Sequence, residues 1–334
     1  MASVDVIVPC YNYGSMLEGC VESILTQDSV DVRVFIMDDA SIDETQLVGR
    51  RLALRDRRVQ YTRHTVNLGH IATYNEALRR VTADYCVLLS ADDLLTPGSL
   101  ARATRLMEVH REIGLAYGRD ITFHRTPPIG AARNPRECGH RIMRYAEFLG
   151  ISCRLGHTPI QAPAAIVRTS LHHRIGNYRP ELPHSGDTEI WLRMAAHAAV
   201  AELDADQAFR RLHARNMSLD YSPLSRLEEQ KKAFDTHFDQ FRETRPEGRA
   251  LQPVAHRTIA EAAFWSGARA FDDGDDMLCD QFLAFARSTS ADIVKWNAWK
   301  RFAWKRRIGR TASRWLAPVA ARVGIGRTAA VERR

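Results

Sequence analysis

Short apolar runs alternate with helical patterns along the first hundred residues of the chain, at a spacing of about thirty residues. This alternation predicts βαβ units and therefore a parallel sheet flanked by helices, as in an α/β fold. The strands that we expect are 4–9, 32–37, 59–62 and 85–89, and the helices between them are 16–27, 45–55 and 71–81. Open sheets of this kind bind their ligands at the carboxyl ends of the strands.

Two of the expected strands end in a pair of aspartates. Asp38 and Asp39 end the second strand, and Asp92 and Asp93 follow the fourth. Either pair alone is also typical of a helix N-cap. On one sheet edge, however, the two pairs form a concentrated anionic site, which costs free energy unless a cation or a donor-rich ligand compensates. Because carboxylates and phosphates are common Mg²⁺ ligands, the pattern predicts a metal–diphosphate site at Asp92 and Asp93.

The positive charge of the chain is concentrated near its C-terminus. The net charge is +7, yet residues 293–331 alone hold ten Lys or Arg and no Asp or Glu, so the remainder is net negative. Because nucleic-acid-binding domains present a basic face, we expect no nucleic-acid partner. The six cysteines are scattered without a C-x-x-C pair, which predicts neither a zinc site nor a disulfide framework.

Several common patterns do not occur in the sequence. Neither G-x-G-x-x-G nor G-x-x-x-x-G-K-[ST] is present, which disfavours a dinucleotide site and a P-loop. No signal-peptide pattern precedes the first expected strand, and no run of about 18 apolar residues is found. We therefore expect a cytoplasmic protein that has no transmembrane helix.

Five motifs follow one another in a specific order. They are VIVPCYN at 6–12, SILTQ at 23–27, FIMDDASIDET at 35–45, NLG at 67–69 with Asn75, and ADD at 91–93. In order and spacing they resemble the inverting family 2 glycosyltransferases of GT-A fold, closely over residues 3–100 and more weakly to about residue 215. The resemblance implies a Rossmann-like, mostly parallel sheet flanked by helices. It also implies a nucleotide-diphosphate sugar as donor and Mg²⁺ or Mn²⁺ as cofactor.

The resemblance implies a role for each matching residue of the nucleotide site. Tyr11 would stack on the nucleobase, and Asp39 would accept a hydrogen bond from it. Asp93 would bind the metal that bridges the two phosphates, with Asp92 near the ribose or a metal-bound water. Ser90 departs from the family pattern, since many members have Asp there. Further nucleotide contacts are expected within the matching motifs at Pro9, Asp38, Asn67 and Gly69.

The segment GDTEIWLR at 186–193 resembles the family motif Glu-Asp-x-Asp/Glu-Leu-Trp-Leu-Arg, from which Gly186 departs. Asp187 matches the general base, which removes the proton of the acceptor hydroxyl on the face opposite the leaving diphosphate. Asp187 would equally suit the N-cap of a helix over 188–197. We expect Glu189 and Trp191 at the acceptor site, with Trp191 stacking on a sugar; a core position is the alternative for Trp191.

The stretch FRRLHARNMS at 209–218 resembles the family's Tyr-Arg-x-His-x-x-Asn-x-Ser. His213 would approach the metal or the diphosphate, and a structural, hydrogen-bonded histidine is an equal alternative. The Gln-x-x-Arg-Trp motif of processive synthases does not occur, which favours one sugar transferred per binding event.

The C-terminal third has a helical pattern. We expect a helix over 222–243 and a hairpin of helices over 254–271 and 277–287, whose acidic loop at 272–275 is solvated. In the tail, basic residues interleave with apolar residues that fall on one helical face: Trp304, Ile308, Ala312, Trp315 and Val319. A basic amphipathic helix of this kind predicts binding to an anionic membrane surface. A solvated arm is the alternative.

The expected organisation is a GT-A domain over 1–215, a helical extension over 216–290 and a basic amphipathic tail over 291–334. The first domain divides into a nucleotide-binding half, 1–115, and an acceptor half, 116–215. The expected function is metal-dependent, inverting transfer from a nucleotide-sugar, with UDP-sugar favoured, to a glycan or lipid-linked acceptor in cell-surface polysaccharide synthesis. Two alternatives remain: a binding module that has lost catalysis, and a nucleotidyltransferase, although no Gly-rich phosphate loop follows the first strand.

Overall fold

The computed structural model of the chain describes residues 1–133, 135, 137–216 and 221–310. Within these residues, nine strands form one sheet in the order β3-β2-β1-β4-β8-β6-β9-β5, with β7 paired to β9. The strands are β1 Ser3–Cys10, β2 Asp31–Asp38, β3 Val59–Arg63, β4 Tyr85–Leu88, β5 Leu94–Leu95, β6 Ile113–Phe123, β7 His140–Met143, β8 Ala165–Arg168 and β9 Ala199–Arg211.

The helices are α1 Gly14–Leu25, α2 Thr45–Arg55, α3 His70–Leu78, α4 Ser99–Val109, α5 Tyr145–Leu155, α6 Thr169–Ile175, α7 Gly186–Ala195, α8 Pro223–Gln240, α9 Gln252–Asp273, α10 Asp276–Thr289 and α11 Asn297–Ile308. Short 3₁₀ helices are η1 Ile129–Ala131, η2 Ala162–Ala164, η4 Pro246–Leu251 and η5 Ala291–Lys295. Of the expected helices, 45–55 has the bounds of α2, whereas α3 ends three residues before the expected limit of 81.

Strands β3, β2, β1 and β4 pair in parallel, as the alternation of strands and helices predicts. Beyond β4 the sheet is mixed, because β8 runs antiparallel to both β4 and β6, whereas β6 and β9 are parallel. The carboxyl ends of β1, β2 and β4 therefore open at one edge of the sheet. The predicted α/β fold class is confirmed.

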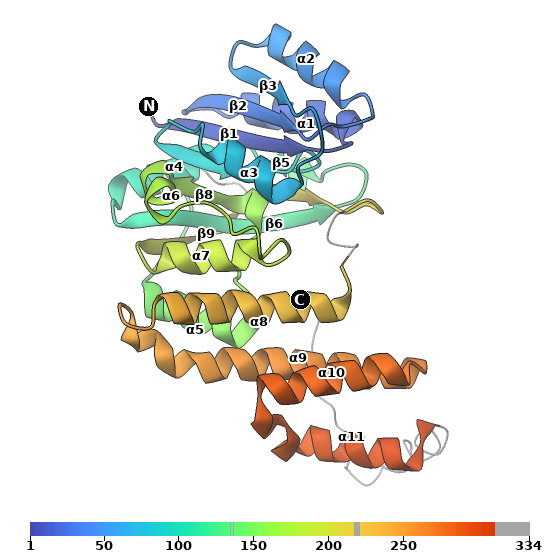
Figure 1. Cartoon of the computed structure of the whole chain (residues 1–334). Helices are drawn as coiled ribbons and strands as arrows, with labels where there is room; N and C mark the ends of the chain where they lie inside the picture. Colours follow the sequence, from blue (N-terminus) through green and yellow to red (C-terminus); the bar gives the residue numbers. More distant parts are fainter. Residues whose placement is uncertain (134, 136, 217–220, 311–334) are drawn as a thin grey trace.

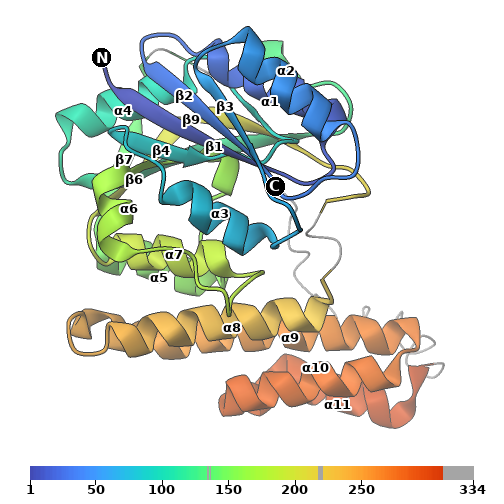
Figure 2. The ribbon, with the colours of Figure 1, turned by 45° about the horizontal axis from the view of Figure 1, so that its top comes forward.

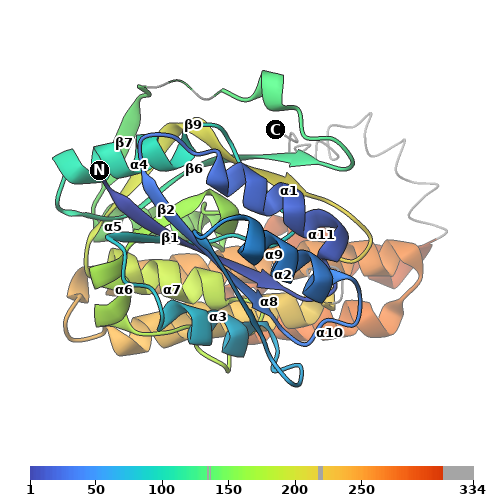
Figure 3. The same ribbon diagram turned by 90° about the horizontal axis from the view of Figure 1, so that it is seen from above.

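Helices cover both faces of the sheet. In β1, Val4, Val6 and Val8 point into a core shared with α1, α2 and α4, whereas Ile7 points into a core shared with α3, α5 and α7. This alternation follows from the two-residue period of a strand, and both sets are apolar because both faces are covered. In the view from above, α1 and α2 lie over the strands (Figure 3).

Helices α8 to α11 form successive layers on the side of α5 and α7 (Figure 1). Helix α8 packs on α7, α9 packs on α8 and α5, and α10 packs on α9. Helices α9 and α10 form a hairpin that turns at Gly274, whose φ of 97° is in the left-handed region that favours glycine. Figure 2 shows α8 and α9 side by side beneath the sheet, with α10 and α11 beyond them.

The beginning of the expected tail is packed rather than extended. Ala298, Trp299 and Phe302 of α11 are buried in a core with α9 and α10, where the rings of Trp299 and Phe264 lie 5.5 Å apart. The boundary expected at residue 291 therefore lies inside a packed layer, because the apolar face of α11 meets an apolar face of the hairpin. Trp304 lies outside this core and is 56% exposed. Ala312, Trp315 and Val319 lie outside the described residues.

The acidic loop of the hairpin is paired with α11 instead of being only solvated. Asp272 forms an ion pair with Lys305, and Asp276 forms one with Arg310. Arg306 pairs with Asp280 at 2.8 Å. These surface pairs add little stability individually, but they fix the register of a basic helix on an acidic hairpin. Within the described part of the chain, no helix combines the length and apolar character that crossing a bilayer requires.

Trp299→Ala is expected to lower the free energy of unfolding by about 3–5 kcal/mol, because it opens a cavity among buried rings. Trp304→Ala is the matched control on the same helix, and its effect is expected within about 0.5 kcal/mol, since the ring is mostly exposed. Urea unfolding of the full chain, followed by tryptophan fluorescence and circular dichroism, measures both. Equal effects of the two substitutions would contradict the packing of α11 described here.

Candidate active site

A cleft of about 630 Å³ opens at the carboxyl edge of β1, β2 and β4. Its walls come from the turn after β1, the turn before α3, the residues after β4, the start of α7 and the end of β9. The sequence-predicted residues that line it are Pro9, Tyr11, Asp39, Asn67, Gly69, Asp92, Asp93 and Asp187. Carboxylates separated by more than a hundred residues in sequence thus share one cavity.

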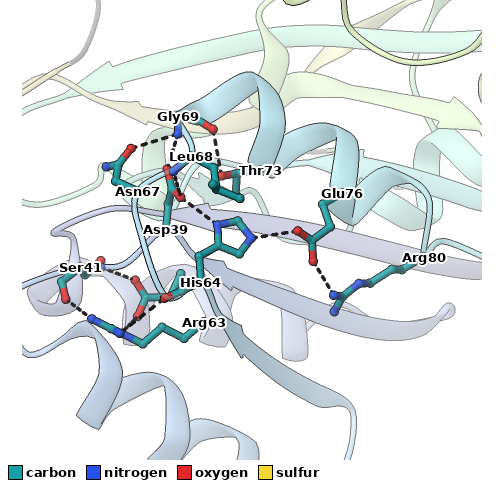
Figure 4. A network of polar contacts seen from close by, with 11 residues as sticks. Asp39, Ser41, Arg63, His64, Asn67, Leu68, Gly69, Thr73, Glu76 and Arg80 are labelled. Atoms are coloured by element: carbon teal, nitrogen blue, oxygen red, sulfur yellow. Dashed lines mark hydrogen bonds and ion pairs between the residues drawn. The ribbon is translucent and has the colours of Figure 1, made fainter.

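Asp39 is buried at one end of the cleft and organises the turn before α3 (Figure 4). Its Oδ1 accepts a hydrogen bond from the backbone N–H of Leu68 at 2.8 Å, and its Oδ2 accepts one from Gly69 at 2.9 Å. His64 donates from Nδ1 to Oδ1 at 2.8 Å. Gly69 has a φ of 81°, so the turn needs glycine to bring these two amides to one carboxylate. Asn67 supports the same turn by accepting from Gly69.

Tyr11 lines the cleft from the turn after β1. Its side chain is 45% exposed, which is high for a large ring at a cavity wall. The turn is fixed by Asn12, whose backbone N–H donates to Ser41 Oγ and whose Oδ1 accepts from Ile42, each at 2.9 Å. An exposed aromatic ring on a fixed turn, in a cleft that a buried carboxylate also lines, is suited to bind a flat, hydrogen-bonding ligand.

Asp92 and Asp93 form the centre of the cleft, and both are buried. Asp93 Oδ1 accepts from the backbone N–H of Arg211 at 2.8 Å, and Asp92 Oδ2 accepts from Nε2 of His213 at 3.0 Å. Asp92 Oδ1 is buried and has no hydrogen-bond partner among the residues that the structure describes. Burial, together with the neighbouring charge of Asp92, holds the pKa of Asp93 well above its usual range.

These residues fit a metal ion that is completed by a ligand. In the described residues, no three His, Cys, Asp or Glu side chains are arranged to hold a metal by themselves. Mg²⁺ and related cations, however, are commonly bound by one or two carboxylates together with substrate phosphates and waters. The buried Asp92 Oδ1 without a hydrogen-bond partner and the raised pKa of Asp93 fit a site where Asp92 and Asp93 would bind a cation.

Asp187 lines the same cleft from the first turn of α7. Ser185, not Asp187, precedes the helix, so the N-cap expected at Asp187 is wrong by two residues. Burial raises the pKa of Asp187, and a hydrogen bond from the Tyr178 hydroxyl and the nearby His70 partly oppose this shift. A Cβ at Gly186 would lie 3.1 Å from the Tyr178 ring, so glycine at this position allows the tyrosine to approach.

The sequence did not reveal the residues that hold Asp187. Tyr178 comes from the loop before α7, and Asn75 of α3 fixes it through two 2.9 Å hydrogen bonds, one to its backbone carbonyl and one from its N–H. Tyr74 and His70 on the same helix line the cleft beside it. Asn75 was recognised as a motif residue without a role; a buried asparagine on a helix needs polar partners, which was the available signal.

Four sequence-predicted site residues are not part of the cleft lining: His213, which touches the site only through Asp92, and Asp38, Glu189 and Trp191. Asp38 is fully buried on the other side of β2, where it accepts from the Tyr61 hydroxyl at 2.5 Å and the Ser41 N–H at 2.8 Å. Consecutive strand residues point to opposite faces, so Asp38 and Asp39 cannot both face the ligand. Glu189 is buried between Arg179 and Arg193, and Trp191 is buried in the core under the sheet. Glu189 and Trp191 therefore serve the packing of α7.

Comparison with known proteins identifies the family. Residues 5–176, more than half of the chain, match the profile described as Glycosyl transferase family 2. The chain belongs to glycosyl transferase family 2. The predicted resemblance is thereby confirmed.

Relatives and solved structures agree with the family assignment. A Campylobacter jejuni protein named GalNAc(5)-diNAcBac-PP-undecaprenol beta-1,3-glucosyltransferase is 31% identical over 102 residues, 30% of this chain and 33% of its own length. The chain aligns with between about one third and two thirds of the length of the first curated relatives.

Two solved structures share the fold. TarS 1–349 of S. aureus, in complex with UDP-GlcNAc, has a TM-score of 0.56 at 14% identity, over 88% of this chain and 92% of that chain. The mannosyltransferase PcManGT from Pyrobaculum calidifontis, in complex with GDP-Man and Mn²⁺, has a TM-score of 0.51 at 20% identity, over 96% and 86%. At these identities the likeness shows the fold alone, and the GT-A fold class is thereby supported.

Asp187→Asn is expected to raise the thermal stability of the protein at neutral pH. Because burial raises the pKa of Asp187, the folded state holds its ionised form less well than the unfolded chain does. The wild type therefore loses stability as pH rises through that raised pKa, whereas the asparagine does not titrate. Melting temperatures measured from acidic to neutral pH should diverge as pH increases. A variant that is less stable than the wild type at neutral pH would contradict this expectation.

Proposed function

We propose that this family 2 glycosyltransferase moves one sugar from a nucleotide-diphosphate sugar, with UDP-sugar favoured, to a hydroxyl of a glycan or lipid-linked acceptor. The transfer inverts the anomeric centre and depends on Mg²⁺ or Mn²⁺. The observation that carries the proposal is the gathering of Asp39, Asp93 and Asp187 around one cleft. The UDP-GlcNAc and GDP-Man in the two similar structures support a nucleotide-sugar donor.

The donor nucleoside occupies the end of the cleft at Tyr11 and Asp39. The exposed ring of Tyr11 stacks on the base, which is the usual way for an aromatic side chain to bind a planar group. Asp39 accepts a hydrogen bond from the base; its three existing donors hold the carboxylate in place for that contact. Pro9, Asn67 and Gly69 complete the wall on this side.

The diphosphate lies at the centre of the cleft, where the charges of the wall are mixed. Asp93, with Asp92 and His213 beside it, would hold the cation, which offsets the negative charge of the leaving diphosphate. Arg210, Arg211 and Arg215 line the same region, and their positive charge complements phosphate oxygens. The Mn²⁺ in the complex of PcManGT supports a divalent cation in this fold.

Asp187 acts as the general base. As the acceptor oxygen bonds to the anomeric carbon, the bond from that carbon to the phosphate oxygen breaks, and the hydroxyl proton passes to the Asp187 carboxylate. The raised pKa of Asp187 favours proton uptake, because the ideal base titrates near the working pH. The Tyr178 hydroxyl donates to the same carboxylate and orients it. The nucleoside diphosphate then leaves from the opposite wall.

A binding module without catalysis has less support from the structure. Its support in the sequence is that Ser90 and Gly186 depart from the family pattern. Glycine at 186 leaves space for the Tyr178 ring, and the Tyr178 hydroxyl acts on the Asp187 carboxylate. This departure is therefore compatible with Asp187 as the general base. Ser90 also lines the cleft. Because serine carries no carboxylate, Asp92 and Asp93 are the two carboxylates available to the cation in this segment. The nucleotidyltransferase alternative is disfavoured by the family match.

Asp93→Ala and Asp187→Asn are expected to reduce transfer by about 10²–10⁴-fold, as removal of a charge-stabilising or general-base group does. Only Asp93→Ala should also weaken Mn²⁺-dependent binding of nucleoside diphosphate. Release of nucleoside diphosphate from UDP-, GDP- and dTDP-sugars, measured with candidate acceptors, gives the rates, and titration calorimetry gives the binding. Asp239→Asn, on the exposed face of α8, is the control. Normal turnover of Asp187→Asn would remove the base assignment.

We also propose that the protein acts at the cytoplasmic face of an anionic membrane, in cell-surface polysaccharide synthesis. The undecaprenol in the name of the Campylobacter relative supports a lipid-linked acceptor. Helix α11 turns its apolar face inward, and its outer face exposes Lys300, Arg301, Trp304 and Arg307. Basic residues and tryptophan together are suited to the headgroup region of an anionic bilayer.

Reversal of three charges, Lys300→Glu, Arg301→Glu and Arg307→Glu in the full chain, is expected to abolish flotation with vesicles that contain phosphatidylglycerol. Each basic residue near such a surface contributes about 1 kcal/mol, so binding should fall by at least about 100-fold. Substitution is preferable to truncation, because removal of α11 would uncover Phe264.

The control for this experiment reverses three exposed basic residues of the sheet domain, Arg50, Arg79 and Arg111. This variant has the same net charge and should float as the wild type does. Equal flotation of both variants, or no flotation of the wild type, would contradict the membrane proposal.

A further inference from the structure

His64 connects the base-binding end of the cleft to helix α3. It follows β3 and is buried between two carboxylates (Figure 4). Its Nδ1 lies 2.8 Å from Asp39 Oδ1, and its Nε2 lies 3.1 Å from Glu76 Oε2. His64 is not part of the cleft lining. Any effect that it has on a ligand is therefore transmitted through Asp39.

The two contacts place one carboxylate at each ring nitrogen of His64. An ionised carboxylate accepts hydrogen bonds and cannot donate them. An N–H on Nδ1 is therefore the group that bonds Asp39, and the contact of Nε2 with Glu76 fixes the orientation of the ring.

The other charged groups around His64 are already paired. Asp38, at the end of β2, pairs with Arg63 of β3 at 3.2 Å. On α3, Arg80 pairs with the second oxygen of Glu76 at 2.5 Å and donates to Thr62 at 2.9 Å. The chain of contacts thus runs from Arg80 through Glu76 and His64 to Asp39 (Figure 4).

Of the described donors to Asp39, His64 is the one fixed to the sheet. The other two are amides of the turn at 67–69, and that turn depends on Asp39 for its own shape. We propose that His64 is a positioning residue for donor recognition: its Nδ1–H holds the Asp39 carboxylate in the orientation that binds the nucleobase. This inference rests on the proposed function, in which Asp39 contacts the base.

Two isosteric substitutions separate the two contacts of His64. In His64→Asn, the amide nitrogen replaces Nδ1 and keeps the bond to Asp39. In His64→Gln, the amide nitrogen replaces Nε2 and keeps the bond to Glu76 instead. We expect the KM for the donor to stay within about threefold in the asparagine variant and to rise about tenfold or more in the glutamine variant, since a bond to a charged group is lost.

The kcat of both variants should stay within about twofold, because His64 contacts no reacting atom. Calorimetric binding of nucleoside diphosphate with Mn²⁺ should follow the KM values. Melting temperatures show whether each variant folds, and Arg80→Ala serves as the control that leaves both contacts of His64 in place. Equal donor KM in the asparagine and glutamine variants would overturn the proposal.

Glu76→Ala gives a second, independent readout, because it removes the carboxylate that fixes Nε2 of the His64 ring. Without that contact the ring holds Asp39 less firmly, so the affinity for nucleoside diphosphate with Mn²⁺ should fall. An affinity equal to that of the wild type would also overturn the proposal, even if the His64 variants did not fold.

Asp39→Asn distinguishes a failure of this inference from a failure of the proposed function. If Asp39→Asn raises the donor KM and the glutamine variant of His64 does not, the nucleotide site stands and the positioning role of His64 is wrong. If Asp39→Asn also leaves the donor KM unchanged, the proposed base contact itself is wrong, and the inference fails with it.

Discussion

The structure depends on one electrostatic constraint: several acidic side chains share a partly buried cleft. Parallel pairing of β2, β1 and β4 brings the ends of these strands to one edge, so Asp39 meets Asp92 and Asp93 there. Burial of like charges is unfavourable, and the raised pKa of Asp93 shows it. A cation and a donor-rich ligand remove that cost when they bind, and this links the architecture of the sheet to nucleotide-sugar chemistry.

The second half of the chain adds further walls to the cleft. Helix α7 begins at the cleft, and its first turn carries Asp187, where the helix dipole favours a negative charge. Asn75 of α3 fixes the backbone of Tyr178, whose hydroxyl lowers the pKa of Asp187. Helix α3, which follows the turn held by Asp39, therefore also supports the surroundings of Asp187.

Much of the fold could be predicted because local patterns determine it. The first four strands and α2 follow from apolar periodicity, and the acidic residues at strand ends line the cleft. What failed needed information beyond the local pattern. The adjacent aspartates 38 and 39 were assigned one role, although strand geometry separates them. The packing of α11 depends on the apolar face of a distant hairpin, and Tyr178 reaches Asp187 from a loop that has no sequence signature.

The central claim is that one nucleotide-sugar spans the cleft from Asp39 to Asp187. A crystal structure of the protein with a nucleoside diphosphate and Mn²⁺ tests it most directly. The account predicts the base between Tyr11 and Asp39, an anomalous Mn²⁺ signal beside Asp93, and Asp187 facing the open side of the diphosphate. A nucleotide bound with its base away from Asp39, or a metal bound far from Asp93, would contradict it.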